Sequence, residues 1–273
     1  GPRYGVYLVP PSPAAYADLQ TSVATALAAL GQKDRAAAFA QSALQSKPDF
    51  VPALMLQARM KAAETDITGA LGLIDQILTL DSTHLGALLL RGNVQRYAQR
   101  EAKAAMATFE LALQAHPKDV AAHLSVINLT LESGDVADAR KRLELLKAAH
   151  PKHPETVFLE ARFAFADKDF ERTRTLTDQL LQALPDDPRV LQLAGINALR
   201  LKSLNVAEAH LLKVVKAQPQ NPVARQLLAG VYNRTGEHGK ALSVLKPLID
   251  APNADSASLT LAGRFGSDFW NRT

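Results

Sequence analysis

The chain has 273 residues, 47% of them apolar, which is enough to build a core and excludes a wholly disordered protein. Its net charge is only +4, and no run of basic residues carries interleaved aromatics, so nucleic acid is not an expected partner. Cysteine is absent, which excludes disulfides, thiolate zinc sites and cysteine nucleophiles, and no apolar stretch reaches the roughly 18 residues that span a bilayer.

The first residues show no regular pattern. Gly1-Pro2 resembles the remnant left by a tag-cleaving protease, and Tyr4–Tyr16 contains three prolines. We therefore expect residues 1–16 to comprise this remnant and an irregular segment that caps the first repeat.

Prolines punctuate the rest of the chain at a fixed interval. They recur at spacings of 69, 34, 34, 34 and 33 residues, at Pro48, Pro117, Pro151, Pro185, Pro219 and Pro252. The gap of 69 holds one unit in which Ser82 takes the place of the proline. Because proline cannot continue a helix, each one is predicted to close a unit of about 34 residues.

Glycines and small residues keep the same register. Gly31, Gly134 and Gly236 lie near the middle of their units, and an Ala follows each of them five places later. Glycine adopts the positive φ that ends a helix and reverses the chain, and the Ala lets a second helix pack closely. Small or apolar residues then return with helical spacing, as at Ala36, Ala40 and Ala43, or Ala105, Phe109 and Ala112.

These features resemble the tetratricopeptide (TPR) family across nearly the whole chain. The resemblance implies an all-α superhelical solenoid of about seven helix hairpins, with units beginning near residues 17, 51, 85, 120, 154, 188 and 222. The TPR units are expected over residues 17–255, and residues 256–273 read as the first helix of a further, truncated repeat. The third unit holds one extra residue, around Gln99-Arg100.

In TPR proteins the first helices line a concave groove, so the resemblance places partner binding there. Residues near the fifth, ninth and twelfth places of a unit share that face. Asn93 and Asn128 would bond the backbone of an extended peptide, and arginines would attract carboxylates. The expected groove residues are Arg59, Asn93, Arg96, Asn128, Arg162, Phe165 and Asn233. The plainer alternative is that these side chains are solvated or contact a neighbouring repeat.

One known variant of the groove is not expected. The TPR clamp for acidic C-termini uses Lys at the fifth place, which here is apolar: Met55, Leu89, Leu124 and Phe158. Catalytic chemistry is not expected either. His150-Pro151-Lys152-His153 lacks an acidic partner, and Asp66, Asp186 and Asp187 read as turn and helix-capping residues. We therefore expect no enzyme activity, no metal and no cofactor.

Three segments resemble the TPR lipoproteins of the bacterial PEP-CTERM/exosortase system: 155–169, 191–201 and 224–232. That resemblance implies a non-enzymatic scaffold on the periplasmic side of the bacterial envelope, tied to protein sorting and exopolysaccharide production. Its partner would be a protein or peptide segment, possibly a polysaccharide, and a membrane anchor would lie outside this chain. Two alternatives remain: a periplasmic scaffold of an outer-membrane exopolysaccharide secretion machine, and the regulatory TPR domain of a larger enzyme.

Overall fold

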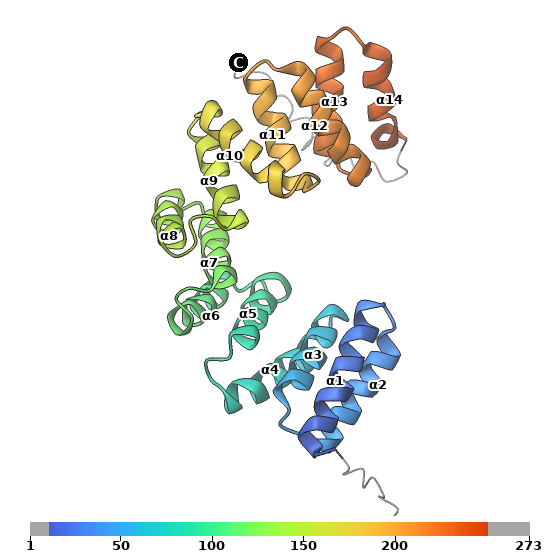
Figure 1. Cartoon of the computed structure of the whole chain (residues 1–273), viewed down its shortest axis with the longest axis vertical. Helices are drawn as coiled ribbons and strands as arrows, with labels where there is room; N and C mark the ends of the chain where they lie inside the picture. Colours follow the sequence, from blue (N-terminus) through green and yellow to red (C-terminus); the bar gives the residue numbers. More distant parts are fainter. Residues whose placement is uncertain (1–10, 251–273) are drawn as a thin grey trace, which may run out of the picture. The chain divides into compact units, whose positions relative to one another are not determined.

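The computed structural model describes residues 11–250, and all regular elements in this range are helices that form seven antiparallel hairpins (Figure 1). The first helices are α1 (Pro13–Ala29), α3 (Val51–Ala63), α5 (Leu85–Asn93) continued by the π-helix η1 (Val94–Ala98), α7 (Val120–Glu132), α9 (Pro154–Ala166), α11 (Pro188–Arg200) and α13 (Pro222–Arg234). The second helices are α2 (Lys33–Ser46), α4 (Ile67–Leu80), α6 (Ala102–Ala115), α8 (Val136–Ala149), α10 (Phe170–Ala183), α12 (Leu204–Ala217) and α14 (His238–Ile249).

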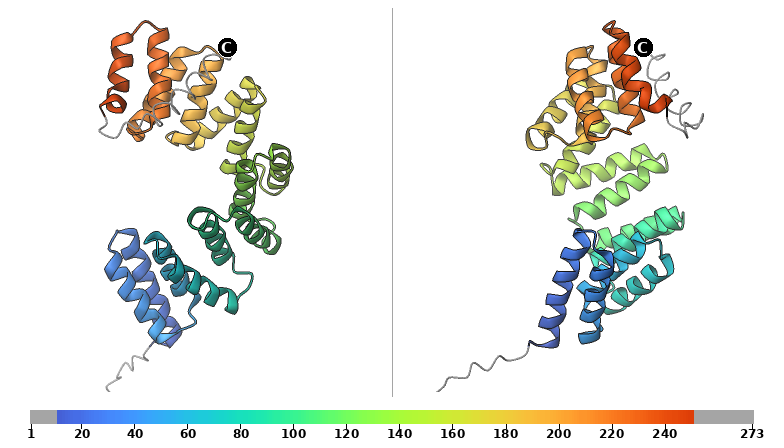
Figure 2. Two further views of the ribbon diagram at one scale, coloured as in Figure 1. Left: turned by 180° about the vertical axis from the view of Figure 1, so that it is seen from behind. Right: turned by 90° about the vertical axis from the view of Figure 1, so that its right-hand side faces the viewer.

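The chain divides at His150 into two compact units, α1–α8 and α9–α14. Within each unit every helix packs on the one before it, and consecutive hairpins stack side by side (Figures 1 and 2). First helices of successive hairpins also contact each other. A hairpin buries its apolar sides against its neighbours, so the core runs as a series of clusters between hairpins. The expected further repeat at 256–273 lies outside the described residues.

Each hairpin reverses direction through one residue in the left-handed conformation, with φ between 60° and 85°. The positive φ predicted for Gly31, Gly134 and Gly236 is confirmed. In the other four hairpins a residue with a side chain takes the same place: Thr65, Arg100, Lys168 and Lys202. Their conformation is dictated by the hairpin, because the side chains themselves disfavour it.

Prolines and capping residues set the helix ends. Each of the five periodic prolines within the described range lies two residues beyond the last residue of a second helix, as predicted: Pro48, Pro117, Pro151, Pro185 and Pro219. The predicted caps at Asp66 and Asp187 are confirmed, since Asp66 Oδ1 accepts from Gly69 N at 2.9 Å and Asp187 Oδ1 accepts from Arg189 N at 2.9 Å. Asn221 caps α13 in the same way.

Small residues at the predicted places bring the helices together. Ala36, Ala40 and Ala43 of α2 are fully buried. On α6, Ala105 and Ala112 flank the fully buried ring of Phe109. Burying a side chain of that size contributes about 1.5–3 kcal/mol relative to leaving it exposed.

The third hairpin accommodates its extra residue by widening a helix. α5 has 9 residues and η1 has 5, so its first helix spans 14, against 13 in α3, α7, α9, α11 and α13. The extra residue was expected around Gln99-Arg100, but it lies slightly earlier, in η1, which ends at Ala98. Arg100 holds the ordinary turn position, and the insertion lies in the π-turn before it.

The N-terminal cap segment also needs a correction. Residues 13–16, expected to be irregular, form the first turn of α1, because Pro13 suits a helix start and Ser12 Oγ accepts from Ala15 N at 3.1 Å. The rest of the expected segment, up to residue 10, lies outside the described range.

Candidate functional site

Four of the expected groove residues lie in the unit α1–α8. Asn93 is exposed at the end of α5 and Asn128 is half-buried on α7, and neither amide bonds to another described residue. Arg59 of α3 is exposed and forms no ion pair within residues 11–250. Arg96 is different, because its Nε donates to Glu132 Oε2 at 3.1 Å and its Nη2 contacts Glu132 Oε1. Arg96 is thus occupied by α7, the alternative left open above.

The other three lie in the unit α9–α14. Arg162 on α9 is exposed and makes no ion pair with any residue that the structure describes. Phe165, one turn further, packs its ring against Phe170 with centroids 5.6 Å apart. Asn233 of α13 is exposed, and its Oδ1 lies 3.1 Å from His238 Nδ1. Arg162 lies in a hollow.

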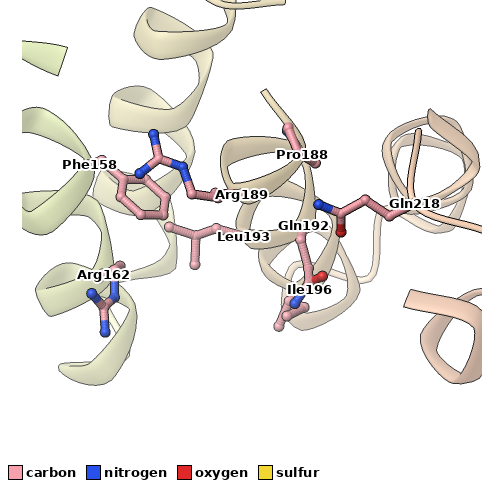
Figure 3. Close-up of a pocket in the computed structure, with 8 residues that line it drawn as sticks. All are labelled: Phe158, Arg162, Pro188, Arg189, Gln192, Leu193, Ile196 and Gln218. Atoms are coloured by element: carbon pink, nitrogen blue, oxygen red, sulfur yellow. The ribbon is translucent and has the colours of Figure 1, made fainter. Parts of the chain in front are cut away.

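That hollow is an open groove between α9 and α11, with a volume of about 320 Å³ (Figure 3). Its floor is aromatic and aliphatic, and its polar groups are guanidinium and carboxamide groups. Its lining residues, here called the unit 2 groove, are Phe158, Arg162, Pro188, Arg189, Gln192, Leu193, Ile196 and Gln218. A second hollow of about 570 Å³ at the α10–α11 turn shares Pro188, Arg189 and Gln218 with it. The two together extend the groove past the start of α11.

Comparisons with known proteins find the same kind of repeat in part of the chain and the same fold over most of it. The tetratricopeptide repeat family model matches residues 96–155 and 131–195. A chain of the APC/C Cut9–Hcn1 hetero-tetramer shares 16% identity at a TM-score of 0.73, covering 88% of this chain and 48% of that one. This chain has the fold of a TPR solenoid.

Two bacterial TPR structures are also similar. PilF of Pseudomonas aeruginosa is 17% identical at a TM-score of 0.63, covering 81% of this chain and 96% of its own. A TPR protein of Parabacteroides merdae is 15% identical at a TM-score of 0.56, and the match covers 73% of this chain and 78% of that one. No curated protein sequence matches the chain significantly. The family model covers repeats between residues 96 and 195, and these structures show the fold of a TPR solenoid, which is typical of protein–protein interaction.

Arg189 forms hydrogen bonds and an aromatic contact along one wall of the unit 2 groove. Its Nη2 and Nη1 donate to the two oxygens of Glu155 on α9, at 2.8 and 3.2 Å. Its Nη2 and Nε donate to Asp187 at 2.9 and 3.3 Å, and its guanidinium carbon lies 5.1 Å from the centroid of the Phe158 ring. The hydrogen bonds that Arg189 donates to Glu155, and then those that it donates to Asp187, raise the pKa of Arg189. The latter bonds also hold the pKa of Asp187 below its ordinary value of 3.8.

The charge balance of the groove therefore differs between its two arginines. Arg189 faces two carboxylates, which neutralise it and fix it over the ring. Arg162, one turn along α9 from Phe158, has no such partner, and Figure 3 shows it pointing away from Arg189. Of the two groove arginines, Arg162 is the one without an ion-pair partner among the described residues.

The unit α1–α8 carries a smaller hollow of about 220 Å³, at the α1–α2 turn and the end of α3. Arg59 and Lys33 line it together with Glu64, and neither cation forms an ion pair within the described range. The rest of its lining is Ala28, Leu56, Met60 and Ala63.

Sequence reasoning found part of the unit 2 groove and missed part of it. Arg162 was expected, Phe158 was placed on the inward face, and Ile196 holds the ninth place of the unit that begins at residue 188, which shares that face. Arg189 and Gln192 were missed, although stepping back from Ile196 by four and seven residues along the helix leads to them. Gln218 follows α12, in a loop, and helical periodicity carries no signal for it.

Among residues 11–250 no cluster of three or more His, Cys, Asp or Glu side chains could hold a metal ion. In the same range no helix is both long enough and apolar enough to cross a bilayer.

Proposed function

We propose that this chain is a scaffold whose unit 2 groove binds an extended segment of a partner protein. The observation that carries the proposal is the groove itself, in which two successive first helices place an apolar floor beside an arginine that no described residue neutralises. Such a surface suits a peptide whose side chains alternate between apolar and acidic contacts. The Cut9–Hcn1 structure, a hetero-tetramer, supports the idea that solenoids of this kind assemble with other proteins.

The polar groups of the groove favour binding over catalysis. Guanidinium groups stay protonated at all physiological pH values, and carboxamides neither give up nor take protons in that range. They can hold a ligand in place but cannot act as a general base. The apolar contribution would come from Phe158 and Leu193, which face each other across the groove in Figure 3.

The experiment is selection of binding peptides from a random peptide library displayed on phage, followed by titration of the selected peptides. Phe158→Ala and Arg162→Ala are each expected to lower the affinity for the selected peptides by about tenfold, which corresponds to about 1.4 kcal/mol of binding free energy. Lys216→Ala on α12 removes one positive charge outside the groove and serves as the matched control. Peptides that bind all four proteins equally would exclude the groove as their site.

The finer biological role rests on resemblance. We propose a scaffold at the periplasmic side of the bacterial envelope, acting in protein sorting or exopolysaccharide production. Segments 155–169 and 191–201, which resemble the PEP-CTERM/exosortase lipoproteins, include most of the two helices that line the groove, although Pro188 and Arg189 lie before the second segment. Affinity capture from the native envelope tests the role. Recovery of envelope partners that Arg162→Ala fails to retain would support it, and exclusively cytosolic fractionation of the native protein would overturn it.

A further inference from the structure

Asn221, the cap of α13, touches both carboxamides of the unit 2 groove. Its Oδ1 accepts from the backbone N–H of Ala224 at 3.0 Å. A backbone N–H can only donate, so this contact fixes which end of the amide is oxygen. The Nδ2 end then donates twice, to Gln192 Oε1 at 3.0 Å and to Gln218 Oε1 at 2.9 Å.

These contacts orient the two glutamines. Since each accepts through its Oε1, each is left with its Nε2 donors, and neither Nε2 bonds to another residue that the structure describes. Both side chains line the groove. Figure 3 shows the amide nitrogen of Gln218 directed toward α11. A single backbone N–H of the next repeat thus determines the polarity of two side chains, one on α11 and one just after α12.

With the glutamines so oriented, the polar side chains that line the unit 2 groove present mainly donors, because each amide oxygen already accepts from Asn221. Arg162 and Arg189 have no acceptor atoms, and the two carboxamides offer N–H groups. The carboxylates nearby are engaged, Asp187 with Arg189 and Asp186 with Lys213 at 3.6 Å. The complementary ligand is therefore rich in acceptors.

We propose that Asn221 is a positioning residue that makes the unit 2 groove select an acidic, extended peptide segment. This inference rests on the proposed function and names the partner's chemistry. A carboxylate of the peptide meets Arg162, and backbone carbonyls accept from Gln192 and Gln218. Apolar side chains of the same segment lie on the floor.

The test uses the full chain with Asn221→Asp. A carboxylate keeps the cap, because Asp caps helices as well as Asn does. It removes the Nδ2 donor, so both glutamines turn their Nε2 groups toward it and expose Oε1 acceptors to the groove. The probes are two fluorescein-labelled peptides, one repeating Glu-Ser-Leu-Ser and one with Lys in place of Glu, titrated by fluorescence anisotropy.

The wild-type chain is expected to bind the Glu peptide at least tenfold more tightly than the Lys peptide. Asn221→Asp should lower the affinity for the Glu peptide by about tenfold and reduce or reverse the preference for it over the Lys peptide. Gln220→Asp adds the same charge to the neighbouring exposed residue without touching the glutamines, and should change either affinity less than about threefold. Gln192→Glu, a change within the groove, should act in the same direction as Asn221→Asp.

The possible failures are separable. If Phe158→Ala abolishes peptide binding while Asn221→Asp and Gln220→Asp bind both peptides with the same affinities, the proposed function stands and the role proposed for Asn221 is wrong. If the wild-type chain binds neither peptide, or if Phe158→Ala binds as the wild type does, both the proposed function and this inference are overturned.

Discussion

Arg189 of α11 holds Glu155 of α9 through two hydrogen bonds, at 2.8 and 3.2 Å, and so ties successive repeats together across the groove. Asp187 shares the same guanidinium, which keeps the pKa of that carboxyl below its ordinary value of 3.8. A carboxyl whose pKa is lowered by folding stabilises the folded state at pH values above its pKa in the unfolded chain. That contribution is lost as the pH falls through its pKa in the folded chain.

The unfolded chain therefore begins to take up a proton at this site near pH 3.8, before the folded chain does. We expect Asp187→Asn, which keeps the helix cap, to be less stable than the wild type at pH 7 and to show a smaller loss of stability below pH 3.8. Urea unfolding at both pH values measures the two differences. Parallel losses in wild type and variant would show that Asp187 is not linked to acid unfolding.

The period of the chain predicted the hairpins because each one must obey the same local chemistry. Proline ends a second helix, glycine reverses the chain, and Ala spaces the helices, so sequence and structure agree there. The groove was less predictable. Arg162 follows from helical periodicity, but whether an arginine is free depends on its neighbours in space. Arg96 is taken by Glu132, which lies on the next first helix.

The turns show a second reason why the sequence did not predict every structural feature. Thr65 and Lys168 occupy the left-handed position without being glycine, because the surrounding hairpin imposes the conformation. Likewise η1 could be anticipated only as an extra residue, since a helix can absorb an insertion anywhere along one turn. Asn221 shows the same limit, because a capping signal predicts one hydrogen bond and not the two that its other end makes.

A substitution at Thr65 tests the strain in the turns. A β-branched residue at φ 62° is disfavoured, while glycine adopts this conformation freely. Thr65→Gly is expected to stabilise the chain by about 0.5–1 kcal/mol, despite the entropy that glycine loses on folding. The reverse change at the equivalent turn, Gly31→Thr, should destabilise by about 1–2 kcal/mol. Chemical unfolding measures both, and equal signs for the two changes would refute the explanation.

Gly92 of α5 tests the close approach between helices. A Cβ at this position would overlap the ring of Phe109, which is fully buried and cannot withdraw. Gly92→Ala is expected to cost about 1–3 kcal/mol through overpacking. The matched control is Gly72→Ala in the interior of α4, where a Cβ meets nothing within 4 Å and should gain up to about 1 kcal/mol of helix propensity.

A double-mutant cycle identifies the cause of the Gly92 effect. Phe109→Leu shortens the side chain that faces the glycine, so Gly92→Ala should cost less in that background than in the wild type. Additive changes in the free energy of unfolding would mean that the ring of Phe109 is not what excludes a methyl group.

Asn93 and Asn128 test whether the unit α1–α8 also grips a partner. Neither amide bonds to another described residue, so removing both should leave helicity and the melting temperature unchanged. If both amides bind the backbone of a peptide, Asn93→Ala with Asn128→Ala should weaken partner binding by about tenfold or more, since each contact contributes about 1 kcal/mol. Gln76→Ala, an exposed carboxamide on the second helix α4, should leave the affinity unchanged. A pull-down titration compares the wild type, the double variant and Gln76→Ala. An unchanged affinity in the double variant would mean that the two asparagines do not contact the partner, and the unit 2 groove would remain the proposed binding site.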